Sequence, residues 1–297
     1  MMRQRRLLLA FLLAGLTPPA GADGGHPLSL WQVSGQGNRV YLLGSIHLLR
    51  EQDHPLPSAI YDAYEDSDKL IMELDMDDLD PIESQALSSQ LGLIQDGRSL
   101  RDLMGEPLYS EAEALADAVQ IPLSLLAQSE PWYAAMNVEI MLLMRIGFNP
   151  QFGVENSLMN LAVAERKEIL GLETLRQQLE ILDGLSVEAQ RDMLMQALAE
   201  GSAMQDTMDT MIRAWRRGDV DFLEENLLAD MQDYPELNRV IVDDRNRDWA
   251  DQIEALLDDA EDYLIVVGAL HLVGDEGVPG LLRSRGHEVV QLSQPAD

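Results

Sequence analysis

Two segments near opposite ends of the chain share one pattern, and together they constrain the fold more than any other feature. Residues 40–49 and 265–273 each contain a β-rich apolar run, then Gly-x-x-His, then two apolar residues. Sites in open α/β sheets form at the carboxyl ends of strands, where a glycine lets the backbone turn sharply. We therefore predict two related half-sites, ending in His47 and His271, that the fold brings together. The alternative is that both imidazoles are structural residues of a loop or of the core.

The remaining pattern predicts an α/β fold in which helices flank a central β-sheet and a largely helical insertion separates the half-sites. Apolar spacing over residues 81–228 is mostly helical. No linker or short repeat divides the chain, so residues 23–297 are expected to form a single domain. Strands are expected at 28–34, 39–43, 69–74, 168–172, 263–267 and 288–292. Helices are expected at 55–65, 186–200, 204–217, 245–257 and 278–284, and a capping box at Thr174 opens another.

Residues 1–22 have the pattern of an export signal. Three arginines precede a short apolar stretch at residues 7–16, and the small residues at 20–22 form a cleavage site of the A-x-A kind. The apolar stretch is short for a helix that spans a bilayer, and an uncleaved anchor is the alternative. We expect a periplasmic or extracellular protein, cut near Ala22, with no membrane span in its mature part.

The charge and the cysteine count exclude several classes of function. Asp and Glu number 52 against 21 Lys and Arg, a formal net charge of −31, and such a surface repels the phosphates of nucleic acids. The chain has no cysteine, which excludes a cysteine nucleophile, a cysteine zinc site and an iron–sulfur cluster. A bound metal must therefore have histidine, carboxylate or backbone oxygen ligands. Motifs of helix-type zinc peptidases, serine hydrolases and nucleotide-binding loops are absent as well.

Three glutamates lie at the ends of expected strands or helices. Glu73 belongs to an otherwise apolar strand, and a buried carboxylate needs a cation or hydrogen-bond donors; a strand-end ion pair with an arginine is the alternative. Glu173 follows a short strand, and an exposed acid before a helix is its alternative. Glu155 precedes a helical stretch, where the helix dipole favours a negative charge.

Arg245 and Asn246 belong to an unusually polar helix start at residues 243–249. Both are candidates for orienting a polar group of a substrate. A solvated helix end with Arg–Asp ion pairs is the alternative.

An ordered set of short motifs runs through the mature chain. They are Trp31 with residues 41–47, then 56–60, 72–75, 153–155, 169–174 with Gln177 or Gln178, 215–219, 244–249, 267–274 and 277–279. No single motif is specific, but the ordered set resembles the TraB/GumN-type family, which is related to the TIKI metalloproteases.

The resemblance implies a metal-linked fold more firmly than it implies one reaction. The family is marked by two Gly-x-x-His motifs and a glutamate, which fall here on Gly44 and His47, on Gly268 and His271, and on Glu73. Its TIKI relatives are proteases that depend on a divalent cation such as manganese or cobalt. The wider superfamily also includes proteins similar to erythromycin esterases and a haem-binding, ChaN-like group.

Three positions depart from the family pattern. Ser45 stands where threonine is typical. Glu155 stands where aspartate is typical, which lengthens a polar contact by one methylene. Leu270 replaces a small residue before His271, and we expect it to narrow the pocket, so the substrates of relatives are not carried over.

The first functional hypothesis is an exported metal-dependent hydrolase that acts on peptide or protein. His47, His271 and Glu73 would hold a divalent cation, and manganese, cobalt or zinc suits this mixed donor set. The cation would activate a water molecule. Glu173 would be a further ligand or a general base.

Further residues complete this hypothesis. Arg245 or Asn246 would stabilise developing negative charge. The positions expected to support the two half-sites are Gly44, Ser45, Glu155 and Gly268. The second hypothesis is a non-catalytic protein that binds a peptide, haem or a metal in the same crevice.

Overall fold

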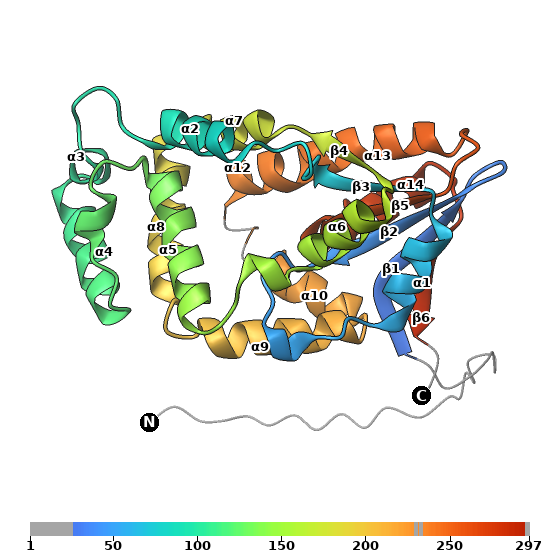
Figure 1. The fold of residues 1–297 in the computed structure, drawn as a ribbon. Coiled ribbons are helices and arrows are strands. Elements are labelled where there is room, and N and C mark those ends of the chain that lie inside the picture. Colours follow the sequence, from blue (N-terminus) through green and yellow to red (C-terminus); the bar gives the residue numbers. More distant parts are fainter. Residues whose placement is uncertain (1–25, 229–230, 232–233, 295–297) are drawn as a thin grey trace, which may run out of the picture.

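The structure is a computed structural model that describes residues 26–228, 231 and 234–294 (Figure 1). The expected export signal at residues 1–22 lies outside the described residues. Six strands form one mixed sheet, and a group of helices extends from the side at which the parallel strands β3 and β4 end (Figure 1). Within the described residues, no helix combines the length and the apolar character that a membrane span requires.

All six predicted strands are confirmed. They are β1 (His26–Ser34), β2 (Arg39–Ser45), β3 (Lys69–Leu74), β4 (Glu168–Glu173), β5 (Tyr263–Gly268) and β6 (Val289–Gln294). β1 and β2 form the predicted antiparallel hairpin, with Leu30 opposite Leu43. At its turn, the Asn38 side chain donates to the carbonyl oxygens of Leu256 and Glu261, both at 2.8 Å. These bonds tie the hairpin to the segment that leads into β5.

The strand order is β4-β3-β5-β2-β1-β6. β5 pairs in parallel with β2 on one side and with β3 on the other, and β3 pairs in parallel with β4. β1 runs antiparallel to both β2 and β6. A strand from the C-terminal part of the chain therefore lies between two N-terminal strands. Four parallel strands end at one edge of the sheet, and both Gly-x-x-His motifs lie at this edge.

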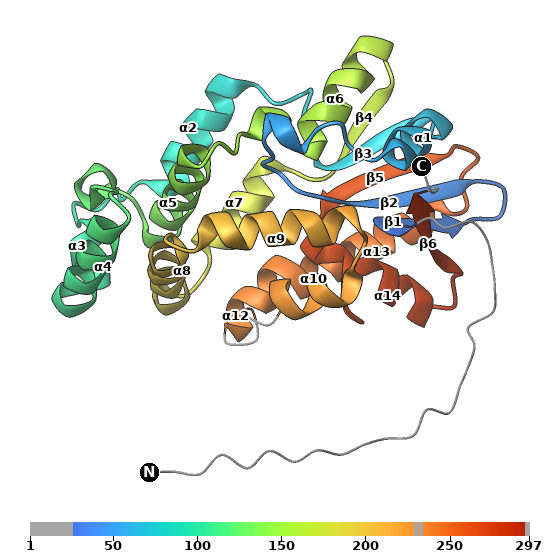
Figure 2. The ribbon, with the colours of Figure 1, turned by 90° about the horizontal axis from the view of Figure 1, so that it is seen from below.

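Helices cover both faces of the sheet, which confirms the α/β prediction. On β5, Leu264 and Val266 belong to one buried cluster, and Ile265 and Val267 to another, because successive side chains of a strand point to opposite faces. Each fully buried side chain of this kind contributes about 1.5–3 kcal/mol. The first cluster is completed by α1 (Ser58–Asp66), α6 (Val154–Glu165), α9 (Met204–Arg216) and α10 (Val220–Leu227), and the second by α13 (Asp244–Leu256) and α14 (Val278–Ser284). Figure 2, which views the molecule from below, has α9 and α10 in front.

A third buried cluster holds the helical insertion together. Its helices, which we call the helical arm, are α3 (Leu100–Met104), α4 (Glu106–Ala118), α5 (Pro131–Arg145) and α8 (Val187–Glu200). α2 (Pro81–Gly92) follows β3, and α7 (Leu175–Asp183) follows β4. Both run from the sheet toward the helical arm (Figures 1 and 2). The predicted capping box of α7 is confirmed at Thr174.

The helix of the polar motif has an extension that the sequence pattern does not predict. The short helix α12 (Pro235–Asn238) and the π-helical segment η4 (Arg239–Asp243) run directly into α13. Single π-helical turns often occur at functional sites. The short 3₁₀ segments are η1 (Glu51–Asp53), η2 (Leu123–Leu126), η3 (Pro150–Phe152) and η5 (Ala269–Leu272).

Candidate functional site

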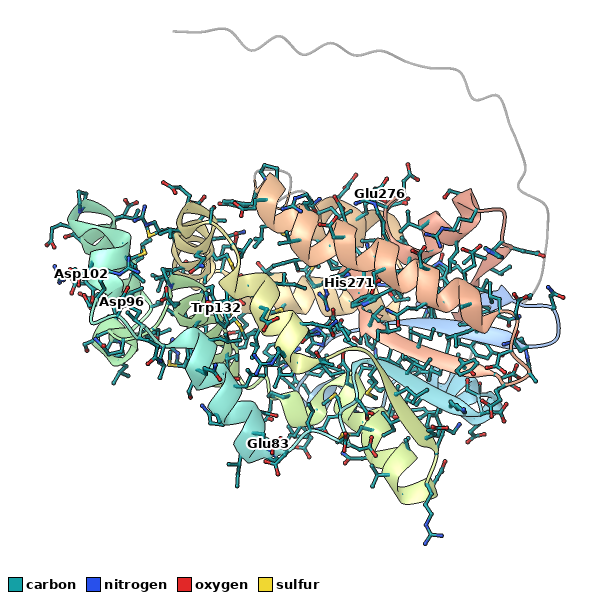
Figure 3. The ribbon with its side chains drawn as sticks, turned by 90° about the horizontal axis from the view of Figure 1, so that it is seen from above. Glu83, Asp96, Asp102, Trp132, His271 and Glu276 are labelled. Carbon is teal, nitrogen blue, oxygen red and sulfur yellow. The ribbon has the colours of Figure 1, made fainter. Side chains whose placement is uncertain are left out.

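Each of the four parallel strands brings one candidate group to the shared edge of the sheet. Across the strand order, Glu173 ends β4, Glu73 lies at the end of β3, His271 follows β5 in η5, and His47 follows β2. Figure 3 shows His271 in the interior of the molecule, next to α13. The predicted meeting of the two half-sites at the carboxyl ends of strands is therefore what the fold produces.

His47 is oriented by a carboxylate from α6. Its Nδ1 lies 2.6 Å from Oε1 of Glu155, and the Ser45 hydroxyl donates to the same oxygen. Glu155 is buried, and its Oε2 has no hydrogen-bond partner among the described residues. The negative charge of Glu155 raises the pKa of His47 to about 9. Since Nδ1 is occupied, Nε2 is the atom of His47 that a ligand can reach.

His271 is oriented by an amide from α13. Its Nδ1 lies 2.7 Å from Oδ1 of Asn246, whose Nδ2 donates to the Glu276 carbonyl at 2.9 Å. An amide oxygen only accepts, so His271 donates through Nδ1 and keeps a lone pair on Nε2. Burial lowers the pKa of His271 to about 3, so the ring is neutral. Asn246 is completely buried, and its amide holds His271 instead of facing substrate as expected.

Arg245 connects both strand-end glutamates with His271. Its Nη2 donates to Glu73 Oε2 at 2.7 Å and also to Glu173 Oε1. Its Nε lies 3.0 Å from Glu173 Oε1, and its Nη1 lies 3.2 Å from His271 Nε2. Burial opposes ionisation of Glu73, but neighbouring charges, Arg245 among them, and the Gly268 N–H lower its pKa to about 2. The strand-end ion pair with an arginine thus forms, and it lies inside the candidate site.

Two residues of the sequence motifs belong to this cluster although the sequence alone assigned them no role. Gln178, from α7, donates through Nε2 to Glu73 Oε2 at 3.1 Å and to Glu173 Oε1 at 2.9 Å. The signal for it was its place one helical turn after Thr174, which caps the helix. Trp249 packs its ring 4.4 Å from the Arg245 guanidinium carbon and 4.5 Å from the His271 ring. Its signal was the same i,i+4 spacing from Arg245 on α13.

Gly44 and Gly268, the glycines of the two Gly-x-x-His motifs, are required for different structural reasons. The Gly268 N–H donates to Glu73 Oε1 at 2.8 Å. A Cβ on Gly268 would lie 3.4 Å from Glu73 Oε1, 3.4 Å from His47 Nε2 and 3.6 Å from His271 Cδ2. Three candidate groups therefore surround one point that only glycine leaves open. At Gly44 the reason is packing, since a Cβ there would lie 3.2 Å from Ala269 Cα.

The donor atoms around the point beside Gly268 are of the chemical types that bind a divalent cation. Two imidazole nitrogens and a carboxylate oxygen are the ligands that manganese, cobalt and zinc accept. Each imidazole has its Nδ1 held by a second residue, as metal-bound histidines do. In the part of the chain that the structure describes, no three His, Cys, Asp or Glu side chains are grouped as a metal site as they stand. Arg245 bonds to two of the candidate donor residues, Glu73 and His271.

An open groove lies beside the segment that follows His47. It has a volume of about 600 Å³ and is lined by Arg50, Glu51, Gln52, Ile146, Gly147, Phe152 and Gln205. The groove therefore joins η1 to the end of α5, η3 and the start of α9. Leu49 pairs with Asn149 in an antiparallel bridge next to it.

Comparison with known proteins gives the following matches. The model of the TraB/PrgY/gumN family matches residues 29–291. The uncharacterized protein YbaP of Escherichia coli K12 is 24% identical over 251 residues, which cover 83% of this chain and 89% of that protein. The uncharacterized protein YbaP of Shigella flexneri matches with the same identity and coverage. No solved structure matches the chain.

Proposed function

The chain belongs to the TraB/PrgY/gumN family, and we propose that it is a metal-dependent hydrolase that cleaves peptide or protein substrates. The observation that carries the proposal is the edge of the sheet, where four adjacent parallel strands bring two oriented imidazoles and two carboxylates together. A polar cluster of this kind, partly buried at strand ends, is where α/β folds carry out chemistry. The pattern at residues 1–22 supports action after export, in the periplasm or outside the cell.

The cation site in this proposal consists of His47, His271 and Glu73. The two histidines offer Nε2, because Glu155 and Asn246 hold Nδ1. A cation held by these residues would supply an activated water and would polarise the scissile carbonyl. The open point beside Gly268 supports this choice of ligands.

Two further side chains have atoms left for substrate. Among the described residues, the hydrogen bonds of Arg245 Nη1 are those to His271 Nε2 and to the Ile241 carbonyl, both 3.2 Å long, so Nη1 is the most weakly bound nitrogen of the guanidinium. We assign it to the oxygen on which negative charge develops. Within the part of the chain that the structure describes, Oε2 of Glu173 has one hydrogen bond, 3.3 Å long, from Arg245 Nε. We assign it to the proton that leaves the attacking water.

We assign the groove beside η1 to the substrate residues that lie next to the scissile bond. It begins three residues after His47, at Arg50, and it mixes polar side chains with Ile146 and Phe152. Such lining suits an amphipathic peptide segment.

A second candidate function is binding of a peptide, haem or a metal without turnover. The observation that favours it is that Arg245 already pairs with both Glu73 and Glu173. In a binding protein, the ion pairs of Arg245 with Glu73 and Glu173 would persist when the ligand binds. Turnover therefore separates the two functions.

The test is cleavage of a peptide library by metal-stripped protein that is reloaded with manganese, cobalt or zinc. Mass spectrometry of the products gives the cleavage sites. His47→Ala and His271→Ala are expected to abolish turnover while the circular dichroism spectrum is kept. His287→Ala is the matched control, because the side chain of His287 pairs with Glu254 of α13 and not with a group of the site. Full activity in either site variant would overturn the proposal, and tight metal binding without any cleavage would favour the binding protein.

A further inference from the structure

We propose that Arg245 is an internal competitor of the divalent cation. In the metal-free protein it bonds to Glu73 and His271, and a cation binds only when Arg245 leaves these two residues while it keeps Glu173. This inference rests on the proposed metal site. It adds that the affinity of the site is set by the exchange of one cation for another.

His271 shows most directly that Arg245 and the cation cannot bind at the same time. A neutral imidazole has one acceptor lone pair, on the nitrogen that carries no proton. Asn246 accepts from Nδ1, so the lone pair is on Nε2. Nη1 of Arg245 lies 3.2 Å from this nitrogen. One lone pair cannot serve both a guanidinium N–H and a metal ion, so the two states are mutually exclusive.

The contacts of the guanidinium also say which partner it keeps. Glu173 accepts from two nitrogens of Arg245, Nε and Nη2. Glu73 and His271 each accept from one nitrogen. A carboxylate that bonds to two nitrogens of one guanidinium holds it more strongly than a single contact does. Glu173 is therefore the anchor from which Arg245 turns.

Two neighbours hold the site while Arg245 moves. Nε2 of Gln178 bonds to the same oxygens of Glu73 and Glu173 that Arg245 uses, so Glu73 stays in place after the guanidinium leaves. Trp249 supports the guanidinium from one face and touches the His271 ring with the same indole. The Trp249 ring thus provides a surface along which Arg245 can turn.

The negative charge of the cluster explains why Arg245 is needed when no cation is bound. Glu73, Glu155 and Glu173 bring three carboxylates to one partly buried region. Close carboxylates without a counter-charge repel each other and are expensive to bury. In the metal-free protein Arg245 supplies that counter-charge to Glu73 and Glu173, and His47 supplies it to Glu155. A bound cation would take over part of it.

The test is calorimetric titration of metal-free protein with Mn²⁺, for the wild type and Arg245→Gln. We expect Arg245→Gln to bind Mn²⁺ at least about tenfold more tightly, because no guanidinium competes for His271. Arg247→Gln is the matched control, since Arg247 lies two residues on and pairs with Asp244 and Glu276 at the surface. A second readout is the thermal midpoint, which Arg245→Gln should lower in metal-free protein, and saturating Mn²⁺ should close that gap.

The outcomes separate this inference from the proposed function. Equal or weaker Mn²⁺ binding by Arg245→Gln would overturn the competition and leave the metal site standing. No binding of Mn²⁺, Co²⁺ or Zn²⁺ by either protein would overturn the metal site itself, and the competition with it. If Arg245→Gln does not fold, Arg245→Lys replaces it. A lysine cannot bond to Glu73, Glu173 and His271 together, so tighter binding is again expected, with a smaller gain.

Discussion

Nδ1 of His47 lies 2.6 Å from Oε1 of Glu155, although 108 positions separate the two residues in the chain. The contact joins the segment after β2 to the first turn of α6. It directs the only histidine of the site that is more than half exposed, with 58% of its side chain open to solvent. The pair therefore fixes which ring nitrogen of His47 faces the proposed cation site.

The His47–Glu155 pair predicts a pH window for stability. The pKa of His47 is raised from its ordinary 6.5 to about 9, so its contribution is complete below pH 6.5 and is lost as the pH rises through 9. The pKa of Glu155 is lowered from its ordinary 4.5, so its contribution is lost only as the pH falls below that value. In metal-free protein, the thermal midpoint of Glu155→Gln should fall furthest below wild type near pH 5.5. The gap should shrink by pH 10, and a gap independent of pH would contradict this.

Asn246→Leu is expected to lower the stability of the fold, and this expectation does not depend on any catalytic activity. Asn246→Leu keeps the size of the side chain but leaves the Nδ1–H of buried His271 without an acceptor. A buried polar group without a partner costs about 1–3 kcal/mol. Urea unfolding should show this loss, whereas Asn226→Leu, at an exposed position of α10, should change stability little. Equal stability of Asn246→Leu and wild type would remove the positioning role.

A substitution at Gly268 tests the point between Glu73, His47 and His271 without disturbing the fold. Gly268→Ala places a methyl group at ordinary contact distance, 3.4 Å from both Glu73 Oε1 and His47 Nε2, so the chain should fold with little change in thermal midpoint. Because the methyl group would occupy the point between the proposed ligands, peptide cleavage should fall by about 100-fold, the order that a misplacement of about 1 Å causes. Gly37→Ala is the control, because nothing lies within 4 Å of the added Cβ. Unchanged cleavage in Gly268→Ala would place the chemistry elsewhere.

Gln178→Leu is expected to lower activity, because the Gln178 side chain bonds to the carboxylates of Glu73 and Glu173. Gln178→Leu removes the bonds to Glu73 and Glu173. Residues that orient the ligands of a metal site typically change metal affinity or activity by about 10–100-fold. Cleavage and Mn²⁺ affinity should both fall in Gln178→Leu, and Gln178→Glu should not rescue them because it adds a fourth carboxylate. Gln196→Leu, which removes an exposed contact with Glu200 on α8, should match wild type.

The groove beside η1 predicts a change in substrate binding alone. Gln205→Trp, at the start of α9, fills part of the groove without touching the strand ends. KM for a cleaved peptide should rise while kcat stays close to wild type, because the substituted group contributes to ground state and transition state alike. Steady-state kinetics on the best library peptide measures both. A fall in kcat with unchanged KM would show that the groove does not hold substrate.

The strands and the shared edge were predictable because their signals are local. Apolar runs, Gly-x-x-His and hairpin glycines are read within ten residues, and parallel strands place their carboxyl ends together by geometry. The family was predictable from the order of its motifs, and the match over residues 29–291 confirms it.

The partners of Arg245 and Asn246 were not predictable in the same way. Both residues open one helix, yet Arg245 turns to the carboxylates of β3 and β4, while Asn246 is buried against His271. The rotation of α13 about its axis decides which of its side chains face the strand ends, and Trp249 packs against Arg245 and His271 there. Those are long-range packing effects, which a short polar motif does not encode.

The position of β5 between β2 and β3 has a consequence for the synthesis of the chain. A nascent chain that lacks residues 263–268 has no strand to hold β2 beside β3. His47 and Glu73 are then parts of separate edges, and His271 has not yet been made. The site is thus completed only when the final strands are added. The order of translation therefore keeps the groups of the site apart until the chain is nearly complete.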